Sequence, residues 1–247
     1  MMDSESVITE CKQAELNKDE FLSKLDNINN DQTEIISIVL QDLKGPLRGI
    51  EALANWILSN CADKLGDQAN NQMDLLLKRV ERMYNLIESA LQYSRAGQTN
   101  GKRIQVNLNN FVPEIISMVV VPENITVTIK NELPVIECEE LHIMQIFQNL
   151  LNNAIKYMDK PEGWIKIGCI EQNSFWKFSI ADNGPGIEKK HFEKIFNIFQ
   201  AFPSSSYFAG SGIGLTVVKK IVELYDGIIW VESEVGEGSS FVFTLPK

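Results

Sequence analysis

The chain has 247 residues, of which 44% are apolar, enough to build the core of one large domain or two modest ones. Its 33 acidic and 23 basic residues give a net charge of −10, which argues against a nucleic-acid-binding surface, because such a surface is basic. A bound anion would therefore depend on local lysines, backbone amides and a metal rather than on a general positive field.

Residues 1–30 are polar and helix-prone, and we expect a helix that leads into the body of the protein. Residues 31–96 contain two runs of apolar residues spaced by three and four, separated by the helix breaker Gly66. The first run is Ile36, Leu40, Leu43, Leu47, Ile50, Ala54 and Ile57, and the second is Met73, Leu76, Val80, Met83, Ile87 and Ala90.

This spacing predicts a hairpin of two antiparallel helices with heptad seams. The apolar stripe is too wide for one hairpin to bury, so we expect a homodimer that forms a four-helix bundle. The alternative is a hairpin that packs on the second domain of its own chain. Gln41 and Asp42 follow the seam residue Leu40 and should point away from the bundle core. Pro46 has no N–H for the carbonyl of Asp42 and should kink the first helix.

Residues 97–106 are polar and interrupted by glycine, which predicts a linker. Residues 107–247 follow as the second domain. Its pattern predicts helices over residues 111–120, 145–157 and 214–225, and strands over residues 125–130, 164–170, 175–181, 228–233 and 240–245. The fold class is therefore α+β, with a two-helix hairpin followed by an α/β sandwich.

The helix over residues 145–157 carries a polar stripe. Asn149, Asn153, Lys156 and Tyr157 are spaced i, i+4, i+7 and i+8, so they share one face, with apolar residues beside them. Such a stripe suits a mostly buried helix that faces a polar ligand, and amide oxygens are neutral ligands suited to Mg²⁺. The alternative is a solvated, asparagine-rich face.

Three glycine-rich segments lie downstream: Asp-Asn-Gly-Pro-Gly-Ile at 182–187, Gly-Ser-Gly-Ile-Gly-Leu at 210–215 and Gly-Glu-Gly-Ser-Ser-Phe at 236–241. Each is a weak signal alone, but the helix and the three segments in this order are a strong one. They resemble the N, G1, G2 and G3 boxes of the ATP-binding domain of sensor histidine kinases, within the gyrase and histidine kinase ATPase superfamily. The resemblance extends from about residue 31 to residue 247. It is closest to phytochrome-like kinases, in which Asp-Leu-Lys-x-Pro-Leu-Arg, here at residues 42–48, is typical.

The resemblance implies a mixed sheet, binding of ATP or ADP with Mg²⁺, and a role for each residue of the boxes. Asn153 would bind the metal with Asn149 beside it, Lys156 would contact phosphate, and Tyr157 would pack near the base or ribose. In the glycine-rich segments, the implied nucleotide contacts are Asp182, Gly184, Gly186, Ile187, Gly210, Gly212, Gly214, Leu215 and Ser239.

Within that set, Asp182 would accept the adenine amino group, and Gly184 and Gly186 would let the base come close. Ser239 would reach the same edge of the base through water. The glycines from Gly210 to Gly214 would direct backbone N–H groups at the phosphates. Without the resemblance, Asp182 would be an ordinary turn residue before Asn-Gly.

The position of the phosphorylated histidine in the resembled kinases is Gln41 here, and Asp42 would be the adjacent general base. A carboxamide nitrogen is delocalised and is not a nucleophile, so we expect no autophosphorylation at residue 41. The two histidines, His142 and His191, are expected to be structural or solvated. Gly45 occupies the position that often carries Thr or Asn in family members that dephosphorylate their partner, so that activity is not expected.

A second departure lies at residues 200–209, where the lid of the resembled kinases commonly has an Arg or Lys and this chain has none. Two departures favour a natural protein that has lost transfer chemistry over a substitution introduced to trap a nucleotide-bound state. The leading hypothesis is a histidine kinase core whose partner is a response regulator receiver domain. The alternative is a nucleotide-gated interaction module for that regulator. A topoisomerase or mismatch-repair ATPase is a weaker alternative, because those have glutamate where this chain has Asn149.

Three further sets of residues complete the interpretation. Phe196 and Phe199 resemble the F-box of the family or are core anchors, and Lys219 and Lys220 are interpreted as surface charges. The cysteines Cys11, Cys61, Cys138 and Cys169 have no metal-ligand spacing and suit reduced thiols of a cytoplasmic protein. No apolar run is long enough for a membrane segment, and no signal peptide is evident.

Overall fold

The computed structural model describes the backbone of residues 4–96, 101–197 and 212–247, and their side chains except at residues 4–35, 37, 61–65 and 95. The elements in chain order are α1 (Ser4–Arg95), β1 (Ile104–Asn107), α2 (Leu108–Met118), β2 (Ile125–Ile129), β3 (Val135–Cys138), α3 (Glu140–Lys156), β4 (Gly163–Gln172), β5 (Phe175–Asp182), η1 (Lys189–His191), η2 (Lys194–Phe196), α4 (Gly214–Leu224), β6 (Ile229–Glu234) and β7 (Gly238–Pro246).

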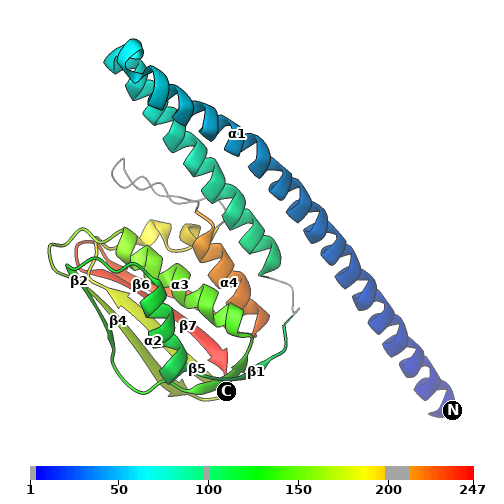
Figure 1. Cartoon of the computed structure of the whole chain (residues 1–247). Helices are drawn as coiled ribbons and strands as arrows, with labels where there is room; N and C mark the ends of the chain where they lie inside the picture. The colour runs from blue at the N-terminus through cyan, green and yellow to red at the C-terminus, as the bar shows by residue number, and fades with distance from the viewer. Residues whose placement is uncertain (1–3, 97–100, 198–211) are drawn as a thin grey trace.

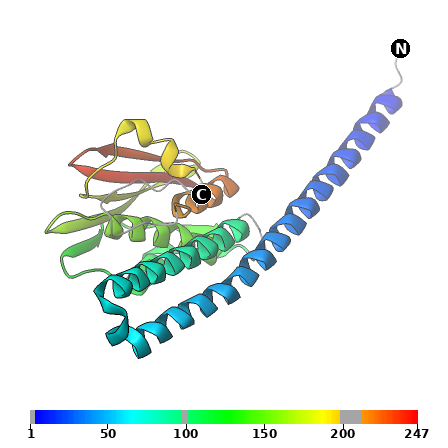
Figure 2. The ribbon, with the colours of Figure 1, turned by 90° about the horizontal axis from the view of Figure 1, so that it is seen from above.

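The predicted hairpin is confirmed. α1 has two helical arms that meet at Gly66, whose φ of 70° and ψ of 166° lie outside the helical region. Pro46, at which the sequence predicts a kink, lies inside the first arm without ending it. The arms are joined by an ion pair between Lys44 and Glu88, and by a hydrogen bond of 3.2 Å from the Tyr84 hydroxyl to the Lys44 carbonyl. Figures 1 and 2 show the second arm next to the following domain, while the first arm extends away from it.

The apolar seam of the hairpin is only half buried within one chain. Leu47, Val80, Ile87 and Leu91 form a small core between the arms, with Leu40 and Tyr84 packed against it. Other seam residues, Leu43, Ile50, Leu76 and Met83, are 48%, 42%, 37% and 43% exposed. Within each arm the buried positions and the exposed positions each recur every seven residues, so the two sets lie along the two edges of one apolar stripe.

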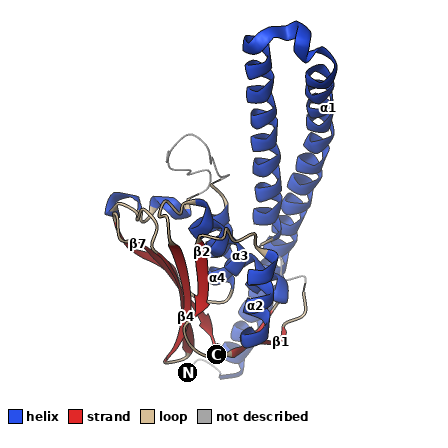
Figure 3. Ribbon diagram, turned by 60° about the vertical axis from the view of Figure 1, so that its left-hand side comes forward, coloured by secondary structure: helices blue, strands red, loops and turns tan. Residues whose placement is uncertain are grey.

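The second domain is an α/β sandwich with a mixed five-stranded sheet in the order β2-β4-β5-β7-β6. β2 is parallel to β4, and the other neighbouring strands are antiparallel. Figure 3 shows α2, α3 and α4 on one side of this sheet. β1 and β3 form a separate antiparallel pair that the sequence does not predict. Since β1 begins at Ile104, the end of the predicted linker, 97–106, belongs to this pair instead.

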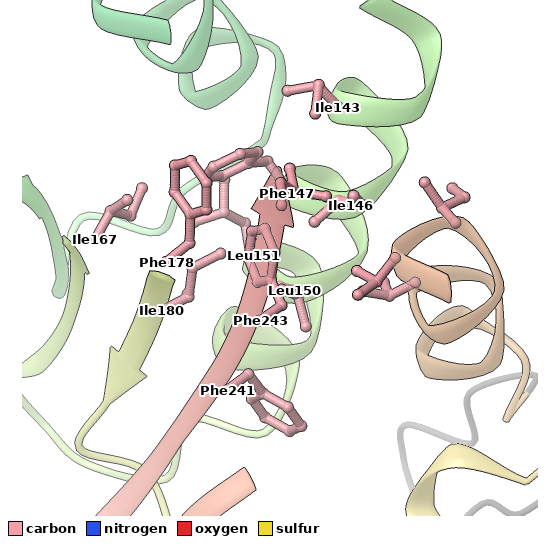
Figure 4. Packing of buried hydrophobic residues seen from close by; sticks show 14 of the residues in the cluster. Ile143, Ile146, Phe147, Leu150, Leu151, Ile167, Phe178, Ile180, Phe241 and Phe243 are labelled. Carbon is pink, nitrogen blue, oxygen red and sulfur yellow. The ribbon is translucent and has the colours of Figure 1, made fainter. Parts of the chain in front are cut away.

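The apolar face of α3 packs on the sheet and so determines where its polar stripe points. Phe147 is fully buried and meets the rings of Phe178 and Phe243 edge-on, at centroid distances of 6.2 and 6.0 Å. Ile146 and Leu150 are also fully buried on this face (Figure 4). Because these residues hold the helix against the sheet, the asparagine stripe cannot rotate into the core.

Candidate functional site

The polar stripe of α3 faces the beginning of α4. The side-chain amide of Asn149 donates to the Gln145 carbonyl at 2.8 Å, which leaves its Oδ1 atom available as an acceptor. That Oδ1 lies against Gly214, the first residue of α4, where a Cβ atom would come within 2.6 Å of it. Only glycine fits at this position without displacing Asn149. The start of α4 and the asparagine stripe are therefore neighbours, as the sequence predicts.

The other end of the stripe meets the first glycine-rich segment, residues 182–187. The Tyr157 carbonyl lies 3.6 Å from where a Cβ of Gly184 would stand. The Lys156 ammonium lies 5.4 Å from the centre of the Tyr157 ring, and both side chains are half-buried. Burial lowers the pKa of Lys156 and raises the pKa of Tyr157. A partly desolvated cation at this end of the helix is well placed to interact with an anion.

Asp182 ends β5 as a buried carboxylate. Its Oδ1 atom accepts the backbone N–H of Gly184 at 2.8 Å, and the backbone N–H of Ser239 on the paired strand also reaches the carboxyl group. Burial raises the pKa of Asp182, the two backbone N–H groups lower it, and the charge of Asp159 raises it. The result is a fixed hydrogen-bond acceptor in a low-dielectric setting, which suits recognition of an amino group.

Two glycines bring the loops around Asp182 into backbone contact. Gly186 has φ +75°, and a Cβ there would lie 2.1 Å from the Glu234 carbonyl oxygen. Gly238 has φ +119°, and a Cβ there would lie 2.0 Å from the Asp182 carbonyl oxygen. From the sequence, Gly186 is expected to be glycine so that a base can come close. The close contact with Glu234 requires glycine there in any case.

Ser233 joins these loops, and the sequence interpretation does not include it. Its hydroxyl accepts the Ile187 N–H at 2.8 Å, lies 2.7 Å from the Gly238 carbonyl and 2.9 Å from the Ser239 hydroxyl. The residue after Gly184, Pro185, is tied to the same turn by the Gly236 N–H, which donates to its carbonyl at 2.7 Å. A single serine in a strand gives no sequence signal, so this junction emerges only from the fold.

The structure therefore brings together the asparagine helix and parts of all three glycine-rich segments. Gly212, with φ +70°, precedes α4, and Leu215 and Ile187 pack against the main core. Gly210, Phe199 and the lid over residues 200–209 lie outside the described residues. Gln41 and Asp42 are exposed on the first arm of α1, a different element.

The other residues named from the sequence have diverse surroundings. Phe196 is buried and meets Phe241 edge-on, as a core anchor. His142 is 2% exposed, and its Nδ1 atom lies 2.9 Å from the Tyr225 hydroxyl, which confirms a structural role. Lys219 is a surface charge paired with Glu223, as expected. Lys220 is not, because it is half-buried and donates to the Tyr93 carbonyl of α1 at 3.0 Å.

Comparison with known proteins supports the resemblance of the second domain to the ATP-binding domain of histidine kinases. Residues 138–247 match the family described as histidine kinase-, DNA gyrase B- and HSP90-like ATPase. Cyanobacterial phytochrome B of Nostoc sp. is 39% identical over 227 residues, which are 90% of this chain and 30% of that protein. The adaptive-response sensory kinase SasA of Synechocystis sp. is 32% identical over 225 residues, which are 86% of this chain and 58% of that protein.

Solved structures share the fold. Full-length ShkA in complex with AMPPNP has a TM-score of 0.63 and 22% identity, covering 86% of this chain and 45% of that chain. The histidine kinase ThkA in complex with the response regulator protein TrrA has a TM-score of 0.58 and 21% identity, covering 89% of this chain and 64% of that chain. The chain spans less than a third of the length of the phytochrome relatives. In the described parts of the chain, no helix combines the length and apolar character needed to cross a bilayer.

Proposed function

Since the chain belongs to the sensor histidine kinases with phytochrome-like relatives, we propose that its second domain binds ATP or ADP with Mg²⁺ at the junction of α3, α4 and the Asp182 loop. The observation that carries the proposal is that three separate stretches of sequence meet: α3 contacts Gly214 through Asn149 and Gly184 through the Tyr157 carbonyl, and Gly184 donates to Asp182. The acceptor chemistry of this group fits a nucleotide whose base offers an amino group and whose phosphates meet the start of a helix.

The same residues fit a bound metal and its phosphates. Asn149 has its amide nitrogen committed to Gln145, so its oxygen is available for a hard cation. Asn153, one turn further on the same face, supplies the second amide, and we assign it the metal contact. Lys156, at the end of the stripe, would contact phosphate. When bound, Mg²⁺ would neutralise phosphate charge. Because the net charge of the chain is −10, only local groups can provide this neutralisation.

Replacing Asp182 with asparagine tests the nucleotide site. We expect the affinity for ATP and ADP to fall about 10- to 100-fold, because one of the two buried acceptor oxygens becomes an NH2 donor that opposes the amino group of the base. Since burial raises the pKa of Asp182, its ionised form is disfavoured in the folded state, and the neutral amide should leave the free energy of unfolding nearly unchanged. Asp159→Asn is the control, because Asp159 is exposed and acts on Asp182 only through its charge.

Isothermal titration calorimetry with MgADP measures this difference, and a thermal-shift assay provides a second measurement. Nucleotide at one hundred times its dissociation constant should add about 2.7 kcal/mol to the stability of the unmodified protein. Equal affinities for Asp182→Asn and Asp159→Asn would contradict the role of Asp182. The absence of any heat with adenine nucleotides would reject the function itself.

We also propose that the exposed half of the hairpin seam mediates a homodimer. Leu43, Ile50, Leu76 and Met83 line that half, and an apolar stripe of this extent is unusual on a monomer. Ile50→Glu should weaken dimerisation about 100-fold or more, because it forces charges into an apolar seam. Ala52→Glu is the control, since Ala52 is exposed on the same arm and off the seam. Light scattering that gives the same mass for both variants would argue against this interface.

The partner that we propose is a response regulator receiver domain, consistent with the relatedness to histidine kinases. Leu53 and Trp56, which are 65% and 60% exposed on the first arm, offer it an apolar surface outside the heptad seam. Because Gln41 lacks a nucleophilic nitrogen, we propose that the unmodified chain does not phosphorylate itself there. A nucleotide-gated interaction with the regulator is then the second candidate function. It requires the affinity for the regulator to change with nucleotide, and an unchanged affinity would exclude it.

A further inference from the structure

The last turn of the hairpin is held by one lysine of the ATP-binding domain. Lys220 on α4 donates to the Tyr93 carbonyl at 3.0 Å, and its ammonium lies 4.5 Å from the centre of the Tyr93 ring. Tyr93 belongs to the last turn of α1, where carbonyl groups have no donor within the helix and carry the negative end of its dipole. Lys220 therefore caps a helix of the other domain.

The surroundings of this contact are apolar. Ala96, 1% exposed, belongs to the core of the ATP-binding domain, and Ala90 and Tyr93 pack against that core. Ser94, between Tyr93 and Ala96, is 7% exposed. Burial lowers the pKa of Lys220. A hydrogen bond and a cation–π contact gain strength in such a setting, because less water competes for the ammonium.

The helix that carries Lys220 also reaches the candidate nucleotide site. Gly214, its first residue, lies against the Asn149 side chain, and Lys220 is within two turns of it. The far end is fixed as well, because the hydroxyl of Tyr225, directly after α4, accepts the Glu139 N–H at 3.0 Å at the start of α3. A helix held at both ends transmits a shift of its first turn to its middle rather than absorbing it.

We infer that Lys220 is a positioning residue that latches the hairpin onto α4 and thereby couples docking of the hairpin to occupancy of the nucleotide site. The coupling rests on the proposed function, whereas the latch does not. Coupling between two sites is reciprocal, so a nucleotide that changes docking must bind with a different affinity when the latch is removed. The other two charged residues of α4, Lys219 and Glu223, pair with each other.

Lys219 provides a matched control for the test. It is the preceding residue on the same helix, its side chain is 44% exposed, and it pairs with Glu223 at 3.8 Å. Lys220→Met keeps the aliphatic stem but removes the charge and the donors, Lys219→Met makes the same change on the surface, and Lys220→Arg keeps a cationic donor. Hydrogen–deuterium exchange of residues 88–96, measured on the full chain, reports docking of the last turns.

Without nucleotide, we expect Lys220→Met to speed this exchange about tenfold, as for the loss of one partly buried charged hydrogen bond, with Lys219→Met and Lys220→Arg close to the unmodified protein. Equal exchange in Lys220→Met and Lys219→Met would overturn the latch. This comparison needs no ligand, so it decides the latch even if the protein binds no nucleotide.

With saturating MgADP, exchange of the same residues should change at least about threefold in the unmodified protein and stay constant in Lys220→Met, with a matching change in nucleotide affinity between the two. Nucleotide that binds without altering residues 88–96 of the unmodified protein would overturn the coupling. Failure of the unmodified protein to bind MgADP would overturn the proposed function, and the coupling with it.

Discussion

Gly238→Ala is expected to lower the free energy of unfolding of the ATP-binding domain by about 3 kcal/mol, the combined cost of a strained backbone and of displaced neighbouring backbone. The φ of +119° at Gly238 disfavours any residue with a side chain, and the new methyl group would lie 2.0 Å from the Asp182 carbonyl oxygen. Relief requires β7 to move away from the end of β5. That movement separates Ser239 from Asp182, so nucleotide affinity should fall as well.

Gly236→Ala is the matched control for this prediction. Gly236 also has a positive φ, +88°, but a Cβ there would meet nothing within 4 Å. It should therefore show only the conformational cost, about 1–2 kcal/mol, and retain nucleotide affinity. Urea denaturation followed by tryptophan fluorescence measures both variants, because Trp164, Trp176 and Trp230 lie in the sheet. Equal losses of unfolding free energy in the two variants would mean that the Asp182 carbonyl does not restrict position 238 to glycine.

The asparagine helix illustrates what the sequence could predict. The regular spacing of its apolar residues is enough to predict the helix. The same period predicts that Asn149, Asn153 and Lys156 form a stripe on its other face. The heptads likewise predict both arms of the hairpin, and the helix breaker Gly66 predicts the break between them. Such patterns are local, since each residue contributes to a period of 3.5 or 3.6 within its own helix.

What the sequence could not predict depends on distant partners. β1 and β3 have four residues each, too few to establish a period, and they exist because they pair with one another. Lys219 and Lys220 are adjacent lysines in one helix, and only the position of α1 makes one a surface charge and the other a half-buried contact. The glycine at 186 shows a related limit: its presence is evident, but not whether a ligand or Glu234 requires it.

The second large effect concerns the proposed loss of the phosphoacceptor: Gln41→His should convert a chain that is expected to retain no phosphoryl group into one that retains it. An imidazole nitrogen has the lone pair that the carboxamide lacks. In the transfer, that nitrogen attacks the γ-phosphorus of ATP, a P–N bond forms, the P–O bond to the β-phosphate breaks and ADP leaves. The proton of the imidazole passes to a base, and Asp42, exposed next to position 41, is the candidate.

The measurement is retention of label from γ-labelled ATP in an acid-labile, base-stable form, as expected for phosphohistidine. The unmodified chain should retain none above background, and Gln41→His should retain label that Gln41→His/Asp182→Asn loses together with nucleotide affinity. Label of this kind on the unmodified chain would refute the account of Gln41. A Gln41→His variant that binds ATP but stays unlabelled would mean that phosphotransfer lacks a further group besides the acceptor. Residues 200–209, which match the lid of the resembled kinases and contain no Arg or Lys, would then be the segment in which to introduce a cation.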